Sequence, residues 1–155
     1  MLASGTLRRG FSLIELVIVV VIIGIIGAIA IPRMSRGATG ASDSALSGNL
    51  AVLRNAIDLY ETEHPGSYPA VSTIVAQLTT YTDDSGAAQA TKDATHIFGP
   101  YLRSIPPLPV GAKKGSTGIS ATDGAGVGWI YVVATGAINA NATESDARGK
   151  AYSSY

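Results

Sequence analysis

The hydrophobic positions of this chain change their pattern along the sequence, and each pattern predicts a different kind of element. Residues 10–32, GFSLIELVIVVVIIGIIGAIAIP, form an apolar run that contains one charged side chain, Glu15. The run from Phe11 to Ile31 is roughly 20 residues long, enough for a helix to span the ~30 Å hydrocarbon layer of a bilayer. The sequence therefore predicts a membrane-spanning helix with a carboxylate close to its start.

A second apolar pattern begins at Leu46 and has the spacing of an amphipathic helix, with steps of four and three residues. Its members are Leu46, Leu50, Leu53, Ile57 and Tyr60. Pro65 and Gly66 end the pattern. The intervening segment, RMSRGATGASDS, is small and polar, and its glycines weaken a helix without excluding one. We therefore expect one nearly continuous helix from Phe11 to about Glu63.

The rest of the chain consists of short segments. Ser72 is a candidate N-cap for a short helix, whose apolar positions are Ile74, Val75, Leu78 and Tyr81. Residues 99–111, GPYLRSIPPLPVG, are rich in proline, which excludes a regular helix or a central strand. We expect an ordered connector there, although Pro106-x-x-Pro109 also fits a polyproline ligand.

A β-hairpin is predicted in residues 128–141, GWIYVVATGAINAN, with its turn near Thr135 and Gly136. The predicted fold class is therefore α+β. It combines a long N-terminal helix, half apolar and half amphipathic, with a head that contains a small antiparallel sheet.

Glu15 requires a cationic partner. An ionised side chain in the middle of a membrane costs about 2.5–3.5 kcal/mol on insertion scales, so it usually marks a functional pairing. The apolar run offers no cation, and the nearest ones in the sequence are Arg8 and Arg9 in the leader MLASGTLRRG. Cleavage after Gly10 would give Phe11 a new α-amino group, which is a second and better placed cation.

The residues around this position carry a family resemblance. Arg-Arg-Gly followed by Phe-Ser-Leu-Ile-Glu-Leu and a Val/Ile run to Pro32 closely resembles the class III signal of type IV pilins and type II secretion pseudopilins. The resemblance implies that a prepilin peptidase cleaves after Gly10 and methylates Phe11, and that Glu15 acts in filament assembly. Glycine and proline both weaken a helix, and Gly24 and Pro32 bound one stretch of this one. The resemblance also implies that this stretch, between Gly24 and Pro32, loses helicity in a filament.

The resemblance also divides the chain into regions. It implies a leader at 1–10, a transmembrane and assembly helix at 11–31, and a pilin-like periplasmic head at 32–155. The N-terminus would be cytoplasmic in a single-pass inner-membrane protein. Charge does not settle this orientation, because Arg8 and Arg9 on one flank balance Arg33 and Arg36 on the other.

The expected partners follow from the same resemblance. They are further copies of the chain in a filament, the prepilin peptidase, minor pseudopilins, an inner-membrane assembly platform with its ATPase machinery, and the membrane. A formal net charge of zero argues against nucleic-acid binding, which requires a basic surface.

Two ordinary explanations compete with this interpretation. A secretory signal would use Ala28-Ile29-Ala30 as its cleavage pattern, but the apolar region of such a signal is shorter and lacks an acidic residue such as Glu15. A plain single-pass anchor is the second alternative, and neither length nor charge excludes it.

The chain contains no cysteine, so a disulfide framework and a thiolate metal site are excluded. Many type IV pilins carry a C-terminal disulfide loop and major pseudopilins generally do not. The segment GPYL, the proline-rich connector and the late hairpin also look more like the major pseudopilin branch.

That branch implies calcium as a candidate cofactor, bound in a late loop by carboxylates and carbonyls. The late acids of this chain are Asp123, Glu144 and Asp146. Calcium takes about six to eight oxygen ligands, so these residues would need much help from the backbone. The tail RGKAYSSY lacks the acidic ending expected of such a site, and solvated surface acids are the alternative.

No catalytic site is expected. His64 and His96 have no evident nucleophile or metal-ligand spacing, and the glycine clusters at 111–116 and 124–128 miss the phosphate-binding patterns. The sequence therefore favours a structural subunit of a type II secretion pseudopilus that polymerises for protein export. The alternatives are a type IV pilin for adhesion, motility or DNA uptake, and a monomeric membrane-anchored binding domain.

Overall fold

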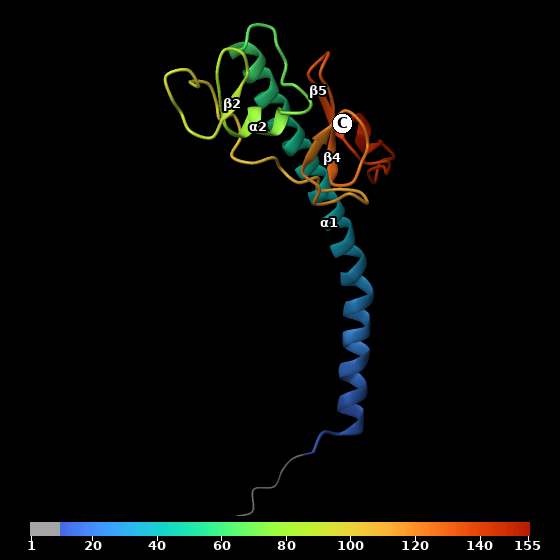
Figure 1. Cartoon of the computed structure of the whole chain (residues 1–155). Coiled ribbons are helices and arrows are strands. Elements are labelled where there is room, and N and C mark those ends of the chain that lie inside the picture. The colour runs from blue at the N-terminus through green and yellow to red at the C-terminus, as the bar shows by residue number, and fades with distance from the viewer. Residues whose placement is uncertain (1–9) are drawn as a thin grey trace, which may run out of the picture. The chain divides into compact units, whose positions relative to one another are not determined.

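The computed structural model describes residues 10–155 and leaves out the side chains of residues 31–36. The predicted leader therefore lies outside the described residues, apart from Gly10. The chain divides into two compact units, one that ends at Ala38 and one from Thr39 to Tyr155. Its first element, helix α1 (Leu13–Glu63), contributes residues to both units (Figure 1).

Helix α1 begins two residues after the predicted start at Phe11 and ends at Glu63, as the sequence predicts. Its helical assignment continues through residues 31–36. In the second unit, one face of the helix is buried. The buried residues include the predicted stripe Leu46, Leu50, Leu53, Ile57 and Tyr60, each at most 2% exposed. Pro65 follows the helix end, and Gly66 adopts a positive φ of 70° that turns the chain away.

Helix α2 (Ile74–Thr79) confirms the predicted short helix but corrects its details. Its N-cap residue is Thr73 rather than Ser72, and Thr73 forms no side-chain capping bond. Val75 is exposed, whereas Ile74 faces the core. The reason is that so short a helix buries only one narrow stripe, and Val75 lies off it.

Two short strands follow α2, and the sequence did not predict them. Strand β1 (Tyr81–Thr82) pairs antiparallel with β2 (Ala88–Gln89). Tyr81 therefore belongs to a strand and not to the preceding helix. A strand of two residues has no room for the alternation by which strands are recognised.

The larger sheet contains the predicted hairpin. Strand β4 (Val127–Val132) pairs antiparallel with β5 (Ala137–Ala140), and Gly136 in the turn has a φ of 69°. Strand β3 (Gly118–Ser120) pairs with the other edge of β4 in the parallel direction. The sheet order is β3-β4-β5, so this sheet is mixed rather than purely antiparallel.

One hydrophobic core joins these elements in the second unit. The sheet contributes three side chains that are 0% exposed to this core, namely Trp129, Tyr131 and Ile138. Trp129 donates its indole N–H to the carbonyl oxygen of Pro106 at 2.9 Å, and the connector adds Leu108, which is fully buried. Residues 99–111 therefore form an ordered connector, as the sequence predicts.

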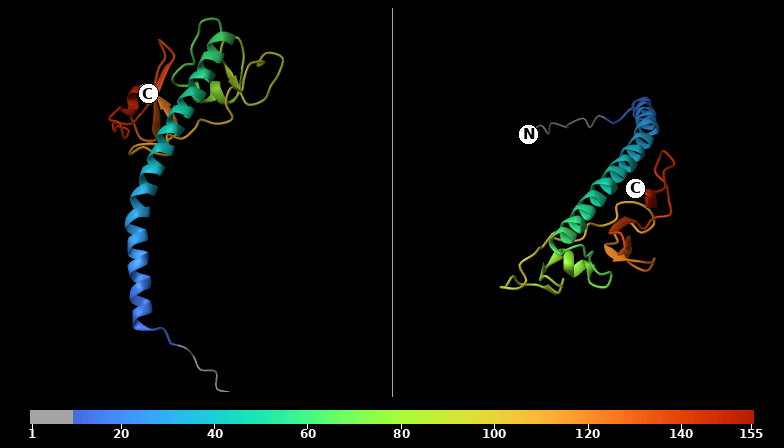
Figure 2. Two further views of the ribbon diagram at one scale, coloured as in Figure 1. Left: turned by 180° about the vertical axis from the view of Figure 1, so that it is seen from behind. Right: turned by 90° about the horizontal axis from the view of Figure 1, so that it is seen from above.

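The elements of the second unit are distributed along α1. The α2–β2 segment lies beside the last turns of the helix, and the β3–β5 sheet lies beside the turns that precede them (Figures 1 and 2). Hydrogen bonds agree with this order, because Arg54 donates to the Ile138 carbonyl in β5 at 3.1 Å, whereas His64 approaches the Asp83 carbonyl at 2.9 Å. The short helix η1 (Tyr152–Ser154) completes the fold. The predicted α+β, pilin-like arrangement is confirmed.

Candidate functional site

The start of α1 places the predicted site residues close together. Gly10 and Phe11 precede the helix, and Phe11 is 79% exposed. Ser12 is the residue before the helix, and its carbonyl oxygen accepts the N–H of Leu16 at 3.1 Å. Glu15 therefore lies in the first helical turn, where the partial positive charge of the helix N-terminus favours a carboxylate.

Glu15 also reaches back along the chain. Its Oε2 atom lies 3.5 Å from the backbone nitrogen of Ser12, which donates to it at the long limit of a hydrogen bond. The sequence Ser12-x-x-Glu15 is the signature of a capping box. The contact of Ser12 with Glu15 was not predicted above, although this spacing is a sequence signal for it.

No ion-pair partner of Glu15 occurs among the side chains that the structure describes. Their ion pairs are His96–Asp93 and Lys113–Asp123, both far along the chain. Arg8 and Arg9 lie outside the described residues. The carboxylate therefore has a weak backbone contact and no neutralising charge in the described part of the single chain.

The apolar helix that follows Glu15 is exposed around its whole circumference. A stretch from Leu13 to Ala30 has the length and composition of a membrane span, and 0% of it is buried. A helix that is apolar all round requires an apolar environment, which lipid or other apolar helices can supply. This finding is consistent with a membrane-anchored protein.

Gly24 and Gly27 lie inside this helix. A Cβ atom at either position would meet nothing within 4 Å, so no packing contact within the described chain requires a glycine. Their effect is to weaken the helix by about 1 kcal/mol each relative to alanine. Pro32 is helical in the described backbone, but its side chain lies outside the described residues. Loss of helicity between Gly24 and Pro32 in a filament stays a prediction.

The three late acids do not gather into one metal site. Among the described residues, no group of three or more His, Cys, Asp or Glu side chains could hold a metal ion. Lys113 and Asn141 donate to Asp123, and these hydrogen bonds, with that of Lys113 as the largest cause, lower the pKa of Asp123 to about 2. Glu144 accepts the N–H of Ala112 at 2.7 Å.

The third acid, Asp146, organises a different turn. Its Oδ1 atom accepts the backbone N–H groups of Arg148 at 2.8 Å and Lys150 at 2.9 Å, and its Oδ2 atom accepts the Tyr155 hydroxyl. The Tyr155 hydroxyl is the main cause that lowers the pKa of Asp146. Asp123, Glu144 and Asp146 therefore have separate hydrogen-bond partners in separate turns, and calcium binding stays a prediction.

The two histidines do not form a catalytic arrangement. His64 is buried between the carbonyl oxygens of Tyr60 and Asp83, each 2.9 Å from a ring nitrogen. At His96, both Thr95 Oγ1 and Asp93 Oδ1 lie near the same nitrogen, Nδ1, at 3.1 and 3.0 Å. A catalytic relay instead places its nucleophile and its acid on opposite ring nitrogens. The cluster at residues 93–96 is therefore a hydrogen-bonded turn.

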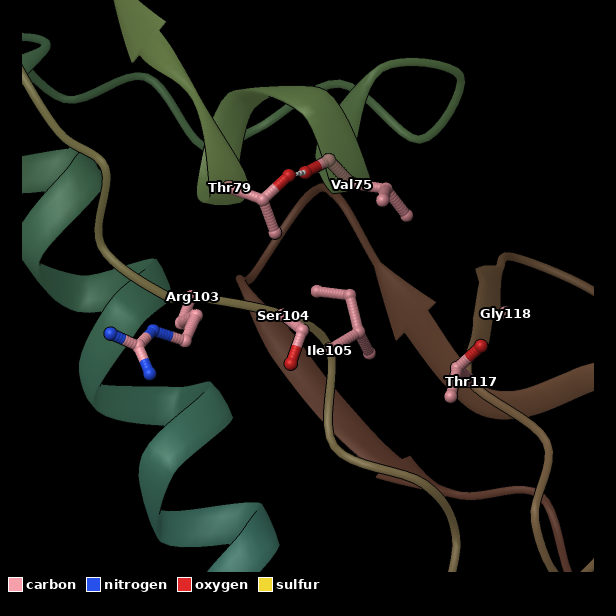
Figure 3. A pocket seen from close by; sticks show the side chains of 7 residues that line it. All are labelled: Val75, Thr79, Arg103, Ser104, Ile105, Thr117 and Gly118. Carbon is pink, nitrogen blue, oxygen red and sulfur yellow. Dashed lines mark hydrogen bonds between the residues drawn. The ribbon is translucent and has the colours of Figure 1, made fainter. Parts of the chain in front are cut away.

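A surface groove lies between α2, the connector and β3 (Figure 3). Its volume is about 400 Å³. The residues that line it are Val75, Thr79, Arg103, Ser104, Ile105, Thr117 and Gly118. The Thr79 hydroxyl donates to the Val75 carbonyl at 2.6 Å, and the Arg103 guanidinium points away from both residues. The lining contains no carboxylate, histidine or cysteine, so it offers no general base to activate its serine and threonine hydroxyls.

Comparison with known proteins adds one finding about the N-terminal segment. Residues 6–31 match the family model described as the prokaryotic N-terminal methylation motif. No curated protein and no solved structure matches the chain. The matched range contains Gly10, Phe11 and Glu15, and it ends one residue after the exposed apolar stretch. Residues 6–31 therefore carry the class III signal of type IV pilin-like proteins, and this motif indicates a pilin-like or pseudopilin protein.

Proposed function

We propose that this chain is a structural subunit of a type II secretion pseudopilus, most like a major pseudopilin. The observation that carries the proposal is the methylation motif at the start of an apolar helix that nothing in the described chain covers. The subunit is stored in the inner membrane, with its N-terminus in the cytoplasm and its head in the periplasm. It polymerises into a helical filament that supports the export of folded proteins.

The assembly step follows from the charges at the start of α1. Once the leader is removed after Gly10, the new amino group of Phe11 is largely protonated at neutral pH. In an arriving subunit, this amine meets Glu15 of a subunit that is already assembled. Opposite charges attract more strongly in a bundle of low dielectric constant than in water. The pairing also supplies the partner that Glu15 lacks in the described chain.

Two features of the chain support secretion over a surface pilus. The chain has no cysteine, so it cannot form the C-terminal disulfide loop that many type IV pilins carry. The connector that resembles major pseudopilins is ordered, with Leu108 and Ile105 in the core. The proposed partners are other copies of the chain, a prepilin peptidase, minor pseudopilins, and the inner-membrane platform with its ATPase.

Processing gives the first test. Expressed with a prepilin peptidase, the mature chain should begin at Phe11 and weigh one methyl group more than residues 11–155 alone. Intact mass spectrometry measures both features. A chain that begins at Ile31 would indicate an ordinary secretory signal, and a retained leader would remove the assignment to this family.

Deletion of the gene tests the secretion role itself. We expect export of folded proteins to stop while surface pili remain, and the wild-type gene to restore export. Loss of surface pili with normal export would favour the type IV pilin alternative. Correct processing without any filament would favour the monomeric anchored domain.

A further inference from the structure

Three segments of the second unit meet at one carboxylate. The Lys113 ammonium forms an ion pair with Asp123 Oδ1, which joins the 111–116 segment to the loop between β3 and β4. Asn141, which follows β5, donates to the same Asp123 oxygen at 2.9 Å and to the Val127 carbonyl at 2.8 Å. The Asp123 carboxylate is therefore the common acceptor of two segments that are distant in the sequence.

Glu144 approaches the same turn from another side. Its Oε1 atom accepts the Ala112 N–H at 2.7 Å. Its Oε2 atom lies so close to Gly111 that a Cβ there would be 2.6 Å away, and Gly111 has a positive φ of 72°. The charge of Lys113 contributes to the lowered pKa of Glu144, after the backbone N–H donors. Glu144 therefore holds the backbone of the same turn that carries Lys113.

These contacts occupy one oxygen of Asp123 and one oxygen of Glu144 that a divalent cation could otherwise use. Calcium requires about six to eight oxygen ligands. Asp123 already accepts from Lys113 and Asn141, Glu144 accepts from Ala112, and Asp146 belongs to another turn. A metal ion at Asp123 Oδ1 would have to displace the Lys113 ammonium.

We propose that Lys113 is a tethered cation that holds these three segments together, so that the head keeps this arrangement without a divalent metal. The lysine carries the positive charge that calcium would otherwise bring to the Asp123 and Glu144 loops. The Lys113 side chain is 32% exposed and that of Asp123 is 67% exposed, so the contribution of this pair is modest.

The test uses the processed full-length protein in detergent micelles. Trp129 is the chain's one tryptophan and is fully buried, so its fluorescence reports unfolding of the head. The melting temperature of the wild-type protein measured with a calcium chelator should agree within about 1 °C with the value measured in millimolar calcium. Lys113→Gln should lower it by about 1–5 °C, as expected for a partly exposed ion pair. Lys114→Gln is the matched control, because the exposed Lys114 forms no ion pair among the described side chains.

A second variant tests whether Lys113 acts through Asp123. In an Asp123→Asn background, the additional change Lys113→Gln should lower the melting temperature much less than it does alone. An equal loss in both backgrounds would overturn the proposal. It would also be overturned if calcium raised the melting temperature of the wild type by several degrees, or if Lys113→Gln matched Lys114→Gln.

Discussion

The two parts of helix α1 differ in where they find apolar contacts. From Leu13 to Ala30 the helix is apolar on every side, and none of it is buried in the described chain. From Leu46 to Tyr60 the regular apolar stripe is buried, with every residue of it at most 2% exposed, whereas Val52 on the other side is 48% exposed. One helix therefore contains a part whose apolar side chains are buried within the chain and a part whose apolar side chains are not.

The difference shows that burial, and not hydrophobicity alone, distinguishes an apolar surface that folds the chain from one that needs an apolar environment outside it. Burial of apolar area stabilises by about 25 cal/mol per Å² wherever the covering atoms come from. The second unit supplies those atoms for the Leu46–Tyr60 stripe. For the first part of the helix they must come from lipid or from other subunits. Changes in the first part should therefore affect assembly, and changes in the second should affect folding.

The largest effect is expected at Glu15. Glu15→Val removes the proposed partner of the neighbouring Phe11 amine, and we expect the rate of filament assembly to fall by about tenfold or more, the equivalent of about 1.4 kcal/mol in a barrier. Membrane insertion should be retained or improved, because an apolar residue replaces a charge. The measurements are filament formation, cargo export and the amount of processed subunit in the membrane.

Glu15→Gln separates the charge from the capping role. Glutamine can also complete the capping box with the Ser12 N–H, but it cannot neutralise an amine. If assembly depends on the charge, the glutamine variant should fail as the valine variant does. Wild-type assembly by Glu15→Gln would assign Glu15 to helix capping instead, and wild-type assembly by Glu15→Val would remove both roles.

The next effect concerns the buried stripe. Leu53 is fully buried, and Leu53→Ala should destabilise the head by about 2–5 kcal/mol through lost burial and a cavity. Val52, the preceding residue, is 48% exposed, and Val52→Ala should change stability by about 0.5 kcal/mol or less. Denaturant unfolding of full-length protein in micelles, followed by Trp129 fluorescence, compares the two. Equal losses would show that the exposed face of this part of α1 also has an apolar partner.

The sequence predicted the features whose signals are local or regular. The stripe from Leu46 to Tyr60 repeats over several turns, and the turn near Gly136 lies between two alternating segments. The class III signal placed the residues around Glu15 by their spacing. Its match to residues 6–31 confirms the motif, and the roles of the individual residues stay predictions.

The features that the sequence did not predict depend on contacts between distant segments. Strands β1 and β2 contain two residues each, which is too few for a periodic signal. The parallel pairing of β3 with β4 is fixed by the folded chain rather than by the composition of three residues. The contacts of Lys113 and Asn141 with Asp123 join residues that lie 10 and 18 positions away in the sequence, so no local pattern announces them.

The smallest effect is expected from a hydrogen bond on the polar face of α1, in the part of the helix that packs within the second unit. The Tyr152 hydroxyl donates to Asp43 Oδ1 at 2.8 Å, which ties the end of the chain to α1 across 109 residues. Tyr152→Phe removes this bond and keeps the ring, so stability at neutral pH should fall by about 0.5–1.5 kcal/mol. Tyr81→Phe is the matched control, because no side-chain hydrogen bond or ring contact of Tyr81 occurs among the described residues.

The pH dependence of the same bond has a defined sign. The hydrogen bond to Asp43 and burial raise the pKa of Tyr152 to about 12 from an ordinary value of 10.0. The folded state therefore holds the proton more tightly than the unfolded state, so the stability from this group is complete below about pH 10 and is lost as the pH rises toward 12. The difference in stability between wild type and Tyr152→Phe should shrink over that interval, whereas the Tyr81→Phe difference should not. A gap that stays constant from neutral to alkaline pH would show that the Tyr152–Asp43 bond does not anchor this end of the chain.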